Sequence, residues 1–103
     1  PDMTLEFFAG QMTVIYLEYQ TNREAWTTAQ KIAAYREHGG DGLKLFLIER
    51  SDAFLVSMAQ LAATGDFCFG RPDAVLASVT PWEAPLFYFG GSQGERLSLI
   101  KLK

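Results

Sequence analysis

Charged side chains are nearly absent from one long segment of this chain. Residues 53 to 94 carry only Asp66, Arg71, Asp73 and Glu83, although the 103-residue sequence has 9 basic and 12 acidic residues. The same segment holds half of the aromatic residues. A chain of this size has few places to bury so much uncharged surface. The segment must therefore form the core, a ligand cavity, a subunit interface or a mixture of these.

Length and composition indicate one folded domain, residues 1–103. Single domains cluster at roughly 100 to 150 residues, which leaves no room for a second one. A hydrophobic content of 49% excludes disorder. We interpret Met3 as the native start, with Pro1 and Asp2 as remnants of cloning.

The charge balance and the single cysteine restrict partners and location. A net charge of −3 and a pI near 5.0 argue against nucleic acid, which requires clustered Lys and Arg. The longest charge-free apolar stretch, Ala53–Gly65, is too short to span a bilayer about 30 Å thick, so we expect no membrane segment. Cys68 cannot form an internal disulfide, which favours the reducing cytoplasm.

Hydrophobic patterning predicts a hairpin followed by a helix. Thr4–Phe8 and Met12–Gln20 are rich in β-branched and aromatic residues, as strands are. Thr21 and Glu24 have the spacing of a capping box, so we expect a helix to begin there and to end at the glycines of residues 39–42.

The next two elements are a strand and an unusually apolar helix. Leu43–Arg50 alternates as a strand does, and Ser51 or Asp52 can cap the helix that follows. In Ala53–Thr64 the apolar stripe covers most of the circumference, and Gly65 is expected to close the helix. Because such a helix should be buried on nearly every side, we expect a dimer or a larger oligomer.

The hydrophobic pattern of residues 67–102 is less regular. Phe67–Phe69 is a short strand, and residues 72–79 fit either a strand or a short helix, of which we favour the strand. The prolines make residues 80–85 irregular. Leu86–Phe89 and Arg96–Leu102 are expected to pair as a closing hairpin.

Together these elements predict a single α+β domain in the order β-β-α-β-α-β-β-β. Its sheet should be antiparallel or mixed, with five to six strands and both helices packed on one face.

Metal and nucleophile chemistry have few candidates. His38 stands beside Glu37 and close to Asp41, but a metal needs three or four converging ligands, so we interpret His38 as a helix-end residue. Cys68 and His38 could form a thiolate–imidazole pair. The flanking phenylalanines favour a buried, inert thiol instead, and we expect no cofactor and no metal.

Two further patterns could mark functional sites. A pair among Glu6, Glu18 and Glu49 could serve as general acid and base if two of them share a sheet face, although strand edges carry Glu routinely. The glycine clusters at residues 39–42 and 90–94 lack the strand–loop–helix context of a phosphate loop, so we reject nucleotide binding.

Aromatic residues are the best candidates for a ligand pocket or an interface, and the alternative is that they fill the core. Trp82 is the most suggestive, because Pro81 and Pro85 hold it in an irregular loop. The candidate residues are Trp26, Phe67, Phe69, Trp82, Phe87 and Phe89.

The sequence therefore predicts a non-enzymatic binding or protein-interaction module that acts as a homo-oligomer. The alternative is a small cofactor-independent enzyme, or a binder of an apolar small molecule, with an aromatic-lined cavity. A cavity with convergent carboxylates would favour the alternative, and a flat apolar patch on a two-fold axis would favour the module.

Overall fold

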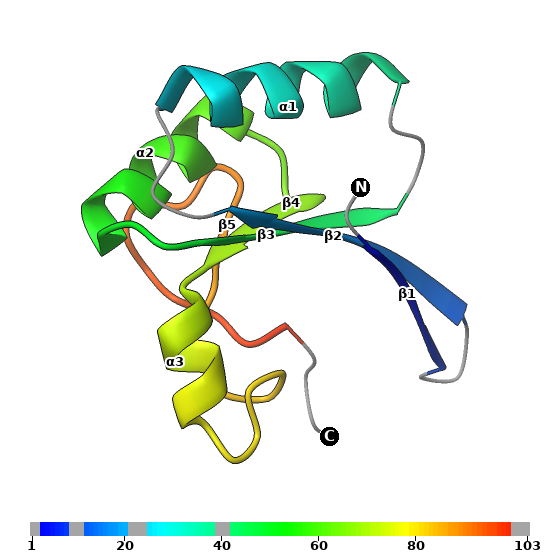
Figure 1. The fold of residues 1–103 in the computed structure, drawn as a ribbon, viewed down its shortest axis with the longest axis vertical. Coiled ribbons are helices and arrows are strands. Elements are labelled where there is room, and N and C mark those ends of the chain that lie inside the picture. The colour runs from blue at the N-terminus through cyan, green and yellow to red at the C-terminus, as the bar shows by residue number, and fades with distance from the viewer. Residues whose placement is uncertain (1–2, 9–11, 21–24, 39–41, 100–103) are drawn as a thin grey trace.

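Helices cover both faces of a five-stranded sheet (Figure 1). The computed structural model describes residues 3–8, 12–20, 25–38 and 42–99, with side chains for residues 15–20, 27–38 and 42–99. The elements in chain order are β1 (Met3–Phe8), β2 (Met12–Gln20), α1 (Ala25–His38), β3 (Leu43–Ile48), α2 (Asp52–Ala62), β4 (Phe67–Gly70), α3 (Pro72–Ala77) and β5 (Tyr88–Phe89).

The strands lie in the order β1-β2-β3-β4-β5 and form a mixed sheet, as predicted. β2, β3 and β4 run parallel, whereas the two edge strands, β1 and β5, are antiparallel to their neighbours. Parallel neighbours need a crossover connection, which α1 and α2 supply. The domain is therefore of the alternating α/β kind, and the predicted α+β class is wrong.

The helices are divided between the two faces. Figure 1 shows α1 and α2 together on one face, as predicted, and α3 on the other. None of the helices in the described ranges has both the length and the hydropathy needed to cross a bilayer.

The strand favoured for residues 72–79 is wrong, because Pro72–Ala77 forms α3. Pro72 stands at the start of this helix, where its missing N–H costs nothing. The predicted closing hairpin is reduced to an antiparallel bridge between Phe87 and Leu97, while Tyr88–Phe89 pairs with β4. Residues 100–102 of its second strand lie outside the described residues.

The caps of α2 confirm one expectation and correct another. Ser51 is the N-cap, and its Oγ accepts a hydrogen bond of 3.3 Å from the Phe54 N–H. The helix ends at Ala63, whose φ of 68° is left-handed, so Gly65 does not close it. The capping box at residues 21–24 and the glycine stop at residues 39–41 lie outside the described residues.

Each face of the sheet has its own hydrophobic cluster, because neighbouring side chains in a strand point to opposite faces. In β3, Phe46 and Ile48 pack beneath α1 and α2, whereas Leu45 and Leu47 face α3 and the C-terminal segment. The buried members of the first cluster are Ile32, Phe46, Ile48, Phe54, Leu55, Met58, Ala59, Ala62, Phe67, Phe69 and Tyr88. Those of the second are Ile15, Leu45, Leu47, Cys68 and Phe87.

A buried lysine ties the amino-terminal ends of β3 and β4 together. Lys44 Nζ lies 2.9 Å from Asp66 Oδ2, and the Lys44 side chain is almost completely buried. Thr64 donates a second hydrogen bond, of 2.6 Å, to Asp66. Partial burial alone would raise the pKa of Asp66, but these hydrogen bonds and the charge of Lys44 outweigh it and hold the pKa below its ordinary value of 3.8.

We expect Asp66→Asn to destabilise the fold at pH 7, because it removes the carboxylate charge that lies 2.9 Å from the buried Lys44 ammonium. A carboxylate with a lowered pKa contributes stability above its ordinary pKa and loses it as the pH falls through the folded value. The difference in unfolding free energy between wild type and variant should therefore shrink below about pH 4. Denaturant titrations at several pH values measure this difference. Asp73→Asn, whose partner Arg71 is exposed, is the matched control and should change stability little.

The turn after β5 packs directly against the end of α2. A Cβ at Gly90 would lie 1.8 Å from the Thr64 carbonyl oxygen, so only glycine fits there. The Gly90 N–H donates to Phe67 O, and the Gly91 N–H donates to Ala59 O, both at 2.9 Å. Gly65 is different, since a Cβ at that position meets no atom within 4 Å.

We expect Gly90→Ala to cost on the order of 3 kcal/mol of folding free energy, because backbone atoms cannot yield to the added methyl. Gly65→Ala makes the same chemical change in open space and should stay within about 0.5 kcal/mol of wild type. Equal denaturation midpoints for the two variants would show that the turn does not pack as described.

Candidate functional site

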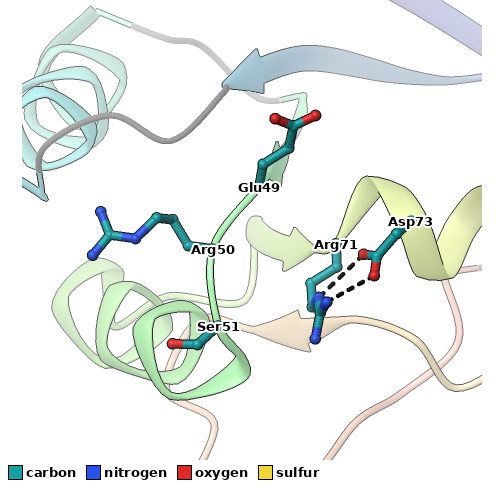
Figure 2. Close-up of a pocket in the computed structure, with 5 residues that line it drawn as sticks. All are labelled: Glu49, Arg50, Ser51, Arg71 and Asp73. Atoms are coloured by element: carbon teal, nitrogen blue, oxygen red, sulfur yellow. Dashed lines mark hydrogen bonds and ion pairs between the residues drawn. The ribbon is translucent and has the colours of Figure 1, made fainter.

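A polar crevice opens at the carboxyl ends of β3 and β4. These parallel neighbours end at the same edge of the sheet, and the chain then continues into α2 on one face and into α3 on the other (Figures 1 and 2). Open α/β sheets bind ligands where successive connections part in this way. The pocket measures about 650 Å³ and is lined by Glu49, Arg50, Ser51, Arg71 and Asp73.

Arg71 holds the two sides of the crevice together. Its Nε and Nη2 donate to the two oxygens of Asp73 at 3.1 and 2.7 Å, as the dashed lines in Figure 2 mark. Its Nη1 lies 3.5 Å from Asp52 Oδ1, in the first turn of α2. The hydrogen bonds and charge of Asp73 raise the pKa of Arg71, so the guanidinium remains charged.

The opposite wall is also held by contacts. The Tyr19 hydroxyl donates a hydrogen bond to Glu49 Oε1, which raises the pKa of Tyr19. The Arg50 guanidinium lies 4.1 Å from the centre of the Phe54 ring. The lining therefore includes two carboxylates and two guanidiniums, each in contact with another side chain, and such groups can form hydrogen bonds to a polar ligand.

The structure does not bring the six predicted aromatic residues to one place. Phe67 and Phe69 are buried beneath α1 and α2, where Phe69 stacks on Phe46 at 5.2 Å between ring centres. Phe87 and Phe89 belong to the cluster on the opposite face. Trp26 is in the first turn of α1, and its side chain lies outside the described residues. The sheet thus separates the candidate residues into two groups.

Trp82 contributes to a surface as well as to the core. Its ring stacks on Phe87 at 6.1 Å between ring centres, and it stays partly exposed. Nearby in the sequence, Leu76 is 85% exposed and Val79 is 98% exposed. A second pocket, of about 360 Å³, is lined by Val79, Thr80, Pro81, Trp82 and Glu83. We call Leu76, Val79 and Trp82 the α3 surface.

The apolar circumference of α2 is covered within the chain. One side of α2 is buried in the first cluster, against α1, β4 and β5. The other side exposes Ala53, Ser57, Gln60 and Leu61, of which only Leu61, at 47% exposure, is a large apolar residue. We expected an oligomer because α2 is so apolar, but the apolar side of α2 is buried within the chain and offers no large apolar surface to a second copy.

Cys68 and His38 lie on different sides of the sheet. Cys68 is completely buried in the second cluster, opposite to Phe67 and Phe69, and burial raises the pKa of its thiol far above the usual range. His38 is the last residue of α1, on the other face of the sheet. Its side chain is exposed, and its Nε2 lies 3.8 Å from Glu37 Oε2. Asp41 lies outside the described residues. The thiolate–imidazole pair is therefore not assembled, and Cys68 is buried as expected.

We expect Cys68 in the native protein to resist a thiol-specific disulfide reagent at pH 8, because a buried thiol with a raised pKa forms almost no thiolate. Labelling should go to completion only when denaturant unfolds the chain. Absorbance of the released thiolate follows both reactions. Rapid, stoichiometric labelling of the native protein would contradict the described burial.

The candidate glutamates belong to separate networks. Glu18 is buried and accepts hydrogen bonds from Tyr35 Oη at 2.8 Å and from Lys31 Nζ at 2.9 Å. Glu49 is exposed and accepts a hydrogen bond from the Tyr19 hydroxyl. The side chain of Glu6 lies outside the described ones. Glu18 and Glu49 therefore do not form an acid–base pair.

Sequence reasoning missed the Arg71 network and the burial of Lys44. The segment Arg71-Pro72-Asp73 directly after a short strand was an available signal, because residues at the carboxyl ends of parallel strands meet. Nothing in the local pattern marks Lys44, since its partner Asp66 lies in a distant turn.

Comparisons with known proteins identify no relative. No protein-family model, curated protein or solved structure matches the chain. Within the described residues, no group of three or more His, Cys, Asp or Glu side chains is placed to hold a metal ion.

Proposed function

We propose that this domain is a non-enzymatic protein-interaction module that acts as a homo-oligomer, and that its copies meet at the α3 surface. The observation that carries the proposal is the exposure of Leu76 and Val79, at 85% and 98%, together with the pocket that Val79 lines with the partly exposed Trp82. Fully burying such an aliphatic side chain is worth about 1.5 to 3 kcal/mol. Single exposed apolar residues are common, but a group of them beside a pocket is typical of an interaction site.

The shape of the α3 surface favours a second copy as the partner. Leu76 projects from the helix, and the pocket beside Trp82 opens on the loop that directly follows. A two-fold contact places each projection against the other copy's pocket, since both features recur on both chains. Trp82 is suited to anchor such a contact, because its stacking on Phe87 fixes the ring before binding.

Further observations support binding over catalysis. The cysteine is buried, its thiol pKa is raised, and the described glutamates are engaged in separate networks. The alternative, an enzyme or apolar-ligand binder with an aromatic cavity, draws less support because the sheet divides the candidate aromatics. The unpaired, buried thiol also fits the cytoplasmic location that we propose.

We expect the double substitution Leu76→Asp with Val79→Asp to lower the oligomer mass in solution while leaving the unfolding midpoint of the monomer nearly unchanged. Both side chains are exposed within one chain, so charging them should disturb only a contact between chains. Light scattering coupled to size exclusion, over a range of micromolar concentrations, measures the mass.

Leu61→Asp is the control, because it makes the leucine-to-aspartate change of the double variant on a half-exposed leucine of α2. It should keep the wild-type mass. A wild-type protein that runs at the monomer mass of 11.5 kDa throughout would refute the proposed homo-oligomer. A double variant with unchanged mass would refute the α3 surface as the contact.

A further inference from the structure

We propose that the crevice at the carboxyl ends of β3 and β4 binds a small zwitterion, a molecule of the amino-acid class with one carboxylate and one ammonium group. The residues that line the crevice are not those of the α3 surface, so this ligand does not depend on the proposed homo-oligomer. Two observations carry the proposal: both signs of charge border the crevice, and its charged groups keep hydrogen-bonding capacity for a ligand.

The crevice has the size and the place of a small-molecule site. Its volume of about 650 Å³ lies within the range of about 300 to 1,000 Å³ that is usual for ligand pockets. It lies where the connections from β3 and β4 part to opposite faces, which is where open α/β sheets bind ligands (Figure 1). Because its lining is charged, the ligand must bring groups that match those charges.

The mixture of charges argues against a simple ion. Two guanidiniums, of Arg50 and Arg71, and two carboxylates, of Glu49 and Asp73, line the crevice. Asp52 adds a third carboxylate, 3.5 Å from Arg71 Nη1. A lone anion such as phosphate would approach three carboxylates, and a lone cation would approach two guanidiniums. A ligand that carries both signs can place each charge beside its opposite.

Arg71 is suited to hold the carboxylate end of the ligand. Its Nε and Nη2 each donate one hydrogen bond to Asp73. Because Nη1 and Nη2 each carry two hydrogens, both can still donate to a ligand, and the side chain is 40% exposed. Ser51, the N-cap of α2, also lines the crevice, and the positive end of that helix favours a carboxylate beside it.

Glu49 is suited to hold the ammonium end. Its Oε1 accepts the hydrogen bond from Tyr19, and its carboxylate is exposed, so Oε2 can accept from a ligand. Figure 2 shows Glu49 on the segment that follows β3, and the Arg71–Asp73 pair on the segment that follows β4. A ligand that spans the crevice can therefore place its ammonium at Glu49 and its carboxylate at Arg71.

Nuclear magnetic resonance titration of the isotope-labelled protein tests the proposal. The probes are glycine, β-alanine, γ-aminobutyrate and ε-aminocaproate, which differ only in the distance between the ammonium and the carboxylate. We expect at least one of them, at millimolar concentration, to shift the amide signals of residues 49–52 and 71–73 in a saturable way. The alkylamine and the alkanoate of the same chain length each keep one charge and should bind at least tenfold more weakly.

A substitution at one end of the crevice identifies which charge binds there. Glu49→Gln should raise the dissociation constant of the best zwitterion at least tenfold but should not weaken binding of the alkanoate, because it removes charge at the ammonium end only. Glu83→Gln makes the same change on an exposed glutamate of the second pocket, so it is the matched control and should bind like wild type. Circular dichroism checks that both variants are folded.

Three results would each overturn the proposal. The first is the absence of a saturable shift with every probe of the series. The second is equal binding of the zwitterion and of its single-charge analogues, or of the neutral polyol sorbitol. The third is an equal dissociation constant for wild type and Glu49→Gln. None of these results involves the oligomer mass, so the α3 surface is judged by its own variants.

Discussion

The parallel pairing of β3 with both of its neighbours is the constraint on which the rest of this structure depends. β3 pairs with a parallel strand on each side, so neither of its edges is free. A crossover connection must join it to each of these neighbours. The crossover helices α1 and α2 cover one face of the sheet. Five consecutive residues of β3 are buried, so the strand is covered on both faces. The remaining face needs a cover of its own, which α3 and the C-terminal segment provide.

Buried polar groups in this central region are tolerated because, with one exception, they have partners. Lys44 is buried with Asp66 at one end of β3, and Glu18 of β2 is buried with Lys31 and Tyr35 beneath α1. Leaving such a group unpaired would cost more than the pair contributes. Gln20 is the exception, because its Nε2 finds no hydrogen-bond partner among the described residues, although its Oε1 accepts from Thr28 at 2.7 Å.

The same arrangement determines where the molecule can make contacts. The carboxyl ends of β3 and β4 meet at the crevice crossed by Arg71, which is polar and balanced in charge. Among the described residues, the two most exposed large apolar side chains, Leu76 and Val79, belong to α3 and to the loop that follows it.

The sequence by itself determined the elements whose signals are local. The spans of β1, β2, α1, β3, α2 and β4 follow from periodicity and from caps within a few residues, and Ser51 is such a cap. Residues 72–77 carry no periodicity long enough to separate strand from helix, so packing decided α3. Only the tertiary structure decided the parallel pairings, the burial of Lys44, the meeting of Arg71 with Asp52 and the division of the aromatics between two faces. Each of these depends on contacts between distant residues, which no local pattern encodes.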